Sequence, residues 1–245
     1  PAPAGRPDAV YLPACVNAMF GPSEGNTGVQ RAFEALCAQA GLVLAVPDGV
    51  DGLCCGTPWS SKGMATGYQA MQLKTVAAII AASRDGEIPV VCDASSCTEG
   101  LLKILQQDAS AVPVVDAVSF VADRVLPRLP AHQKLASLTV HPTCSSAQLG
   151  TDSALLVVAR AAAEVVVVPD DWGCCGFAGD RGMLHPELTA SATTAEAAQV
   201  RARPTSGYVS CNRTCEIAMT RATGQDYRHV IEVLADRASA PARAW

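Results

Sequence analysis

The chain has 245 residues, of which 49% are hydrophobic and 17% charged, and its formal net charge is −5. This composition allows a packed core and argues against intrinsic disorder. The acidic balance, with no basic run, argues against binding to nucleic acid or to an anionic membrane surface.

The longest apolar runs, residues 76–82 and 165–168, are far shorter than the roughly 20 residues that a membrane-spanning helix needs. The chain opens with PAPAGRPDAV, which is proline-rich and contains neither an initiator methionine nor an apolar signal segment. We therefore expect residues 1–8 to be a linker at the start of a fragment. The fragment should not be transmembrane, and we place it in the cytoplasm or peripherally at the inner face of the membrane.

Short apolar runs and helix-like segments alternate along the first half of the chain. Apolar runs that read as buried strands end near residues 12, 46 and 92, and helix-like segments follow them. The segment 29–41 has an apolar stripe at helical spacing that includes Cys37, which we expect to pack as a small core residue. Prolines 127 and 130 mark a junction at residues 124–134.

The second half of the chain repeats the first. PDGVDGLCCG recurs as PDDWGCCG, AVYLPAC as LTVHPTC, PVVCDASSCTE as GYVSCNRTCE, and FVADR as VLADR, in the same order. Five matched landmarks, including a basic residue followed by Gly-Met after each CCG, indicate a duplicated unit. We expect a linker at 1–8, a first unit at 9–130 and a second unit at 131–245.

Each unit reads as strand–Cys–helix–strand–CysCys–helix–strand–Cys–helix. Strands that alternate with helices predict βαβ crossovers and a parallel sheet, and valine-rich strands suit a sheet covered on both faces. The expected fold class is α/β, with two pseudo-repeated parallel-sheet units that carry cysteines at the carboxyl ends of their strands.

The chain contains eleven cysteines, an odd number that favours metal or redox chemistry over a disulfide framework. Loops from neighbouring parallel strands converge at one sheet edge, so distant cysteines should meet there. The candidate ligands of the first unit are Cys15, Cys54, Cys55 and Cys97. Those of the second unit are Cys144, Cys174, Cys175 and Cys215. No residue is assigned to acid–base catalysis.

Converging thiolates repel one another unless a cation or a cluster holds them. Structural zinc normally uses C-x₂-C pairs, which this chain lacks, whereas adjacent cysteines suit a multi-iron cluster. We expect an iron–sulfur cluster, of the 4Fe-4S kind, in each unit. Zinc in at least one site and dithiol chemistry remain the alternatives.

Several strings resemble the cysteine-rich CCG domains found in heterodisulfide reductases and in the iron–sulfur subunit of glycolate oxidase. The resemblance is greatest to the C-terminal region of D-lactate dehydrogenases that contain FAD and iron–sulfur clusters. The strings that carry it are CCGTPWSSKG, DASSCT, HPTCSSAQLG, WGCCGFAGDRGMLHPELT and SCNRTCEIAMTRATG, and they cover most of residues 9–230.

This resemblance implies an electron-transfer module of an oxidoreductase. In such proteins a flavin domain oxidises a D-2-hydroxy acid, and ferredoxin-like and CCG segments pass the electrons to an acceptor. The FAD-binding and ferredoxin-like domains would be partners in the same polypeptide or complex, and the fragment alone would be inactive. Heterodisulfide-reductase-like thiol–disulfide reduction and a zinc-stabilised docking domain are the alternative functions.

One departure from the heterodisulfide reductase pattern concerns its terminal C-x₂-C. The positions three before Cys97 and Cys215 are Ala94 and Asn212, so a four-thiolate site is expected instead of a noncubane cluster with five ligands. Cys92 and Cys211 lie nearby after strand-like runs, and we expect a core or supporting role for them.

Four other residues near the predicted sites could act at a site or be structural. His141, just before Cys144, is either a donor that tunes the cluster or a hydrogen-bonded loop histidine. His185 reads as structural at a helix start. Lys62 and Arg181, near the CCG turns, either stabilise an anionic site or form ordinary surface ion pairs.

Overall fold

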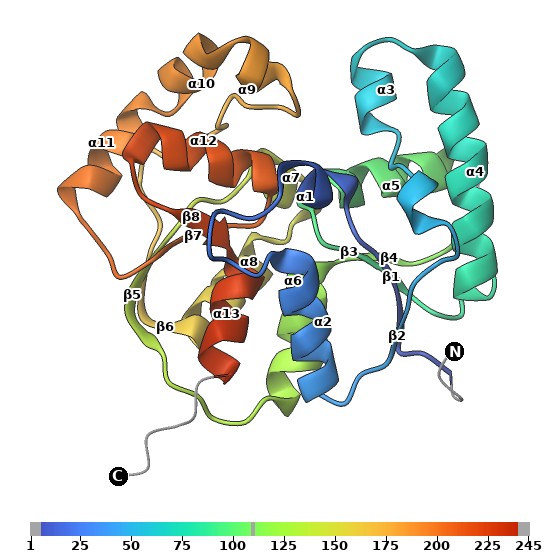
Figure 1. Cartoon of the computed structure of the whole chain (residues 1–245), viewed down its shortest axis with the longest axis horizontal. Helices are drawn as coiled ribbons and strands as arrows, with labels where there is room; N and C mark the ends of the chain where they lie inside the picture. The colour runs from blue at the N-terminus through green and yellow to red at the C-terminus, as the bar shows by residue number, and fades with distance from the viewer. Residues whose placement is uncertain (1–5, 109–110, 240–245) are drawn as a thin grey trace.

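Two all-parallel sheets of four strands, each flanked by helices, make up the protein, as the computed structural model shows (Figure 1). The structure describes residues 6–108 and 111–239. The first sheet has the order β2-β1-β3-β4 and the second the order β6-β5-β7-β8, so the two orders correspond. The expected α/β class with two pseudo-repeated units is confirmed.

The strands are short and alternate with helices. Those of the first sheet are β1 (Ala9–Leu12), β2 (Leu44–Ala45), β3 (Val90–Cys92) and β4 (Val114–Asp116). Those of the second are β5 (Leu135–Val140), β6 (Ala163–Val167), β7 (Tyr208–Ser210) and β8 (Tyr227–His229). Three strands per unit were predicted and four are present, because no cysteine motif follows the short strands β4 and β8 to mark them in the sequence.

The helices of the first unit are α1 (Cys15–Phe20), α2 (Val29–Gln39), α3 (Thr57–Ser61), α4 (Ala65–Ser83), α5 (Ser95–Gln107) and α6 (Ala117–Phe120). Those of the second are α7 (Cys144–Leu149), α8 (Asp152–Ala162), α9 (Arg181–Leu184), α10 (Pro186–Ala192), α11 (Thr194–Ala202), α12 (Arg213–Thr223) and α13 (Val230–Ser239). The repeat is imperfect after the CCG loops, where the long helix α4 corresponds to the broken pair α10 and α11.

The two units share one hydrophobic core. Alternate residues of β1 face opposite sides: Tyr11 joins a cluster with α2, and Val10 joins a cluster with α4 and α5. The cluster around Tyr11 continues through α6, α8 and α13 to Leu138 and Val209 of the second sheet. These four helices therefore form a central layer between the sheets (Figure 1).

A buried carboxylate joins β4 to this central layer. Asp116 is the N-cap of α6: its side chain accepts a hydrogen bond from the amide of Val118 (2.9 Å) and one from the hydroxyl of Thr98 (3.3 Å). Burial disfavours the charged form more than these bonds favour it, and the pKa of Asp116 is raised to about 7.

We expect Asp116 to make the protein less stable as the pH rises. An aspartate in an unfolded chain has a pKa of about 3.9, so between about pH 4 and 7 the folded state binds more protons. The free energy of unfolding should fall through this window by up to about 1.4 kcal/mol per pH unit for this group. Urea titrations at pH 5 and 7 should show a smaller fall in the free energy of unfolding for Asp116→Asn than for the wild type. The asparagine keeps a side chain that can cap the helix. Equal falls in wild type, Asp116→Asn and the exposed control Asp123→Asn would contradict the assignment.

Candidate metal centres

The candidate cysteines lie at the carboxyl edge of the two sheets. Cys15 opens α1 directly after β1, and Cys144 opens α7 directly after β5. Cys97 and Cys215 occupy the first turns of α5 and α12, which follow β3 and β7. Parallel strands bring these helix starts to one edge, as the sequence predicted.

The paired cysteines come from loops and not directly from strand ends. Cys54 and Cys55 lie nine and ten positions beyond the end of β2, after a short 3₁₀ turn at Val50–Gly52. The paired cysteines therefore reach the carboxyl edge through a longer loop than the single cysteines do. The backbone must reverse sharply here, and Gly56 (φ 81°) and Gly176 (φ 70°) adopt the left-handed conformation that glycine tolerates best.

The first CCG loop packs closely against α5. A methyl group at Gly100 would lie 2.9 Å from the carbonyl oxygen of Cys55, so only glycine allows this approach. The contact sets Cys55 beside Cys97, which lies one helical turn before Gly100.

The four candidate thiols of the first unit interact as neighbouring pairs, but within the described residues no three of them form a group as compact as the one in the second unit. Cys54 contacts both Cys15 and Cys55, and Cys55 contacts Cys97. Cys55 and Cys97 are buried, whereas Cys15 is exposed and Cys54 half-buried. The thiols thus form a row from solvent to core.

The second unit repeats this arrangement of an inner and an outer pair. The sulfurs of Cys175 and Cys215 are buried and 3.0 Å apart. Cys144 and Cys174 are exposed and interact with each other. All eleven cysteines of the chain are free thiols. The ligand role of the eight remains a prediction.

Contacts between the thiols shift their pKa values in opposite directions. In the first unit, the contact with Cys15 lowers the pKa of Cys54 to about 3, while the same contact raises that of Cys15. In the second unit, the contact with Cys215 lowers the pKa of Cys175 to about 5, and the pKa of Cys215 is raised. In each unit, therefore, one thiol of an interacting pair ionises more readily than its partner, and the thiolate is the form that binds metals and attacks disulfides.

A histidine completes a compact group in the second unit. His141, Cys175 and Cys215 each offer a ligand atom, and the three atoms lie within 4.8 Å of one another. His141 is fully buried, and its Nδ1 lies 2.8 and 3.0 Å from the two carboxylate oxygens of Glu196. Burial disfavours the charged imidazole, but Cys175 and Glu196 favour it more, and the pKa of His141 is raised to about 9. The group can hold a metal ion.

Sequence reasoning assigned no role to Glu196. It lies in α11, 55 positions from His141, and is only 2% exposed. A glutamate on the apolar face of a helix is the feature that points to it, because charged side chains are rarely buried without a partner.

The two further cysteines near the sites differ from each other. Cys92 ends β3, and its thiol interacts with that of Cys97, so it adds a fifth sulfur to the first unit. Cys211 lies 3.7 Å from the hydroxyl of Thr143, and burial raises its pKa to about 12. Cys37 lies apart from both sites in the shared core.

The two centres lie on adjacent parts of the molecule. The hydroxyl of Ser95, which opens α5, lies 3.1 Å from that of Thr143 and 2.7 Å from that of Ser145. Because Ser95 is two positions from Cys97 and Thr143 precedes Cys144, this hydroxyl cluster links the segments that carry the two sites. Lys62 pairs with Asp180 at 2.8 Å between the two CCG loops, and both side chains are about half exposed.

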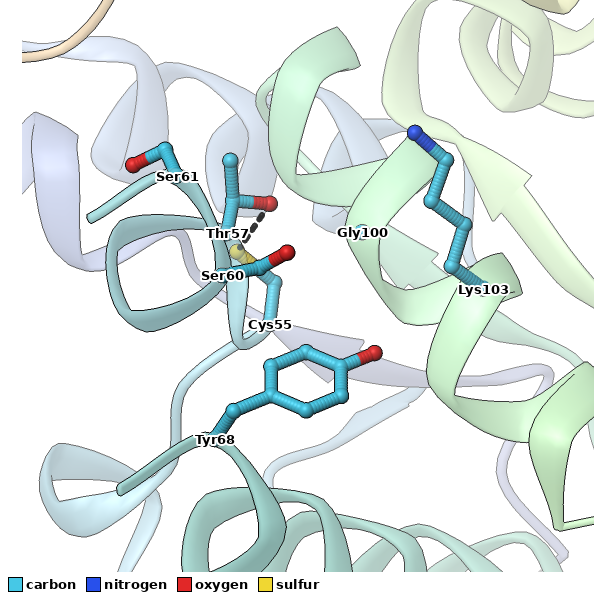
Figure 2. A pocket seen from close by; sticks show the side chains of 7 residues that line it. All are labelled: Cys55, Thr57, Ser60, Ser61, Tyr68, Gly100 and Lys103. Atoms are coloured by element: carbon cyan, nitrogen blue, oxygen red, sulfur yellow. Dashed lines mark hydrogen bonds between the residues drawn. The ribbon is translucent and has the colours of Figure 1, made fainter. Parts of the chain in front are cut away.

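A cavity of about 220 Å³ adjoins Cys55 in the first unit (Figure 2). The thiol of Cys55 donates a hydrogen bond to the Thr57 hydroxyl at 3.4 Å beside it. Tyr68 and Lys103 also line this cavity, from α4 and α5.

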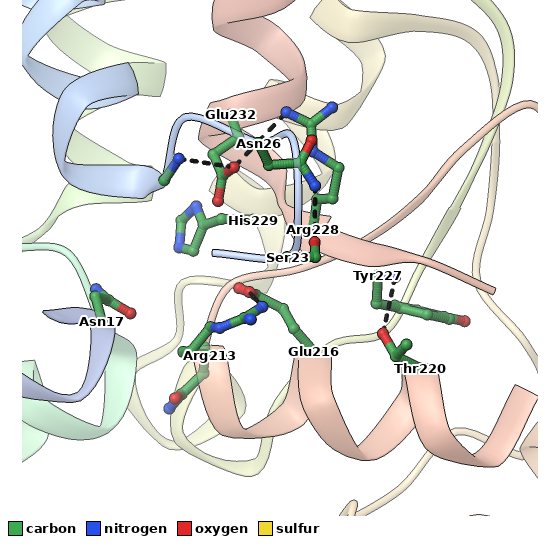
Figure 3. A network of polar contacts seen from close by, with 12 residues as sticks. Asn17, Ser23, Asn26, Arg213, Glu216, Thr220, Tyr227, Arg228, His229 and Glu232 are labelled. Carbon is green, nitrogen blue, oxygen red and sulfur yellow. Dashed lines mark hydrogen bonds and ion pairs between the residues drawn. The ribbon is translucent and has the colours of Figure 1, made fainter. Parts of the chain in front are cut away.

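A buried polar network flanks α12 on the side of the shared core (Figure 3). Arg213 and Glu216 form an ion pair at 3.0 Å, and Arg228 lies 3.6 Å from Glu232. Glu232 also accepts a hydrogen bond from the amide of Gly28 at 3.2 Å, which ties the start of α2 to the second unit.

Comparisons with known proteins agree with the cysteine pattern. Residues 138–220 match the family model of the cysteine-rich domain CCG, so the CCG assignment is confirmed for this segment. No curated protein matches the chain. Within the described residues, no helix is both long and apolar enough to cross a membrane.

Three solved structures are distantly similar. An aspartate racemase homologue from Pyrococcus horikoshii OT3 has a TM-score of 0.36 at 10% identity, covering 94% of this chain and 96% of that one. A putative Asp/Glu racemase from Yersinia pestis gives 0.40 at 13% identity, with 94% and 97% covered. Glutamate racemase isoform RacE1 from Bacillus anthracis gives 0.37 at 10% identity, with 94% and 79% covered.

Proposed function

We propose that the chain is an iron–sulfur electron-transfer module with one cluster in each unit. The observation that carries this proposal is that each sheet has, at the same edge, two buried free thiols next to two more exposed ones. Four thiols gathered from distant segments match the ligand number of a 4Fe-4S cluster. The exposed outer cysteines would leave one side of each cluster close to solvent, where a redox partner can approach.

The proposed ligands of the first cluster are Cys15, Cys54, Cys55 and Cys97. Those of the second are Cys144, Cys174, Cys175 and Cys215. The clusters would supply one-electron chemistry, and the chain's part is to hold them, partly shield them and set their potentials through nearby groups.

The larger reaction follows from the family resemblance. A flavin domain that oxidises a D-2-hydroxy acid such as D-lactate would pass electrons through a ferredoxin-like domain to this module. The module would then pass them to an acceptor. We expect no hydroxy-acid oxidation from this chain alone, because no residue is assigned to abstract a proton or a hydride.

Two observations favour alternative functions. The group of His141, Cys175 and Cys215 has the composition of a zinc site, which supports a metal-stabilised docking domain. The lowered pKa of Cys54, a half-buried thiol, suits a nucleophile in thiol–disulfide exchange.

Metal analysis after anaerobic purification separates these functions. We expect brown protein that absorbs near ~400 nm and contains iron and sulfide, with an EPR signal after reduction. Colourless protein with stoichiometric zinc would replace the proposal by the docking domain. Metal-free protein that reduces a model disulfide would replace it by the reductase.

A further inference from the structure

An unused nitrogen faces the buried thiols of the second centre. Nε2 of His141 is fully buried and has no hydrogen-bond partner. The ligand atoms of His141, Cys175 and Cys215 lie mutually within 4.8 Å. A buried polar atom without a partner is costly. Because Nδ1 is bonded to Glu196, Nε2 is the nitrogen left to serve as the ligand atom beside the two sulfurs.

Glu196 orients this nitrogen. Its carboxylate accepts a hydrogen bond from Nδ1–H of His141, at 2.8 and 3.0 Å, so the free lone pair of a neutral ring belongs to Nε2. A carboxylate that holds the far nitrogen of an imidazole is the usual support of a histidine that binds a metal.

In the first unit, the positions that correspond to His141 and Glu196 are occupied by apolar residues. Leu12 and His141 each lie three positions before the first cysteine of their unit, and Val76 and Glu196 each lie 21 positions after the CCG pair's second cysteine. Leu12 and Val76 are buried together in one hydrophobic cluster. The fold therefore does not require a polar pair here, and burying one is unfavourable unless it has another use.

We propose that Nε2 of His141 is a metal ligand of the second centre, with Glu196 as its positioning residue, and that the first centre is held by sulfur alone. This inference rests on the proposed function for the identity of the metal, but it assigns the ligand whichever metal is bound. In a cluster with four protein ligands, His141 would take the place of one of the two exposed thiolates, Cys144 or Cys174, while Cys175 and Cys215 remain ligands. Because replacing thiolate by imidazole raises the potential of an iron–sulfur centre, the second centre should be reduced at a more positive potential than the first.

Pulsed EPR of the complete chain tests the assignment. The protein is prepared anaerobically with ¹⁵N-labelled histidine, reduced, and examined for hyperfine coupling between the paramagnetic centre and histidine nitrogen. We expect a coupling of the strength that a directly bound nitrogen gives. His141→Gln should lose it, and His185→Gln, which changes an exposed histidine, should keep it. Glu196→Gln should keep the coupling but shift the potential.

If His141→Gln does not fold, the presence or absence of the histidine coupling in the wild-type protein still tests the ligand assignment. Iron and sulfide without a strong histidine coupling would overturn the inference and leave the electron-transfer proposal standing. If the protein instead contains zinc, the electron-transfer proposal fails. X-ray absorption at the zinc edge then tests the ligand. Coordination of zinc by both sulfur and nitrogen would support the His141 assignment, and coordination by sulfur alone would overturn it. His141→Cys should retain the metal and shift the second potential downward.

Discussion

Cys54→Ser is expected to remove about half of the bound iron and sulfide, because only the first cluster loses a ligand. Cys54 interacts with both Cys15 and Cys55, and these contacts lower its pKa, so it ionises more readily than its neighbours. A serine hydroxyl does not ionise at this pH and cannot replace a thiolate. The equivalent change Cys174→Ser should remove the other half, and the double variant nearly all. Iron and sulfide per chain, measured after anaerobic purification, give the result directly.

Cys37→Ser is the matched control for this prediction. Cys37 is also a free thiol, but it is buried in α2 within the shared core and belongs to neither site. It should retain the iron and sulfide of the wild type. Equal iron content in Cys54→Ser and Cys37→Ser would contradict the proposed ligand set.

Phe33→Ala is expected to lower the free energy of unfolding by about 3–5 kcal/mol, as truncations of large buried side chains do. Phe33 is fully buried between Tyr11 and Phe120, with ring centroids 4.9 and 5.9 Å away. Its cluster extends from the first sheet through the central helices to the second. The loss should therefore appear in both units at once, as a single unfolding transition at lower denaturant concentration.

Denaturant titration followed by circular dichroism and by fluorescence checks this result. Met19→Ala, at a side chain that is 70% exposed, is the control and should change the midpoint little. Two separate transitions in Phe33→Ala, with the second unit at its wild-type midpoint, would show that the shared core does not couple the units.

Much of the candidate site was predictable because cysteine is chemically conspicuous and the repeat aligned its positions. The spacing of CCG and single cysteines, together with the rule that parallel strands end at one edge, placed the candidate thiols of each unit together. The position of Glu196 on the apolar face of its helix marks it as unusual, but the sequence does not show which side chain it contacts. Its partner His141 lies 55 positions away, and only the tertiary structure brings the two side chains together.

The sequence by itself determined the α/β class, the duplication and the two groups of cysteines, because hydrophobic alternation and repeated motifs are local features that survive without a structure. The tertiary structure alone decided how the units combine. Both sheets bury one face against α2, α6, α8 and α13, since each unit leaves an apolar surface that only the other covers. It also decided that the two sites differ: Leu12 and Val76 are apolar where His141 and Glu196 are polar, and the chemistry of a buried pair depends on which side chains the fold places in contact.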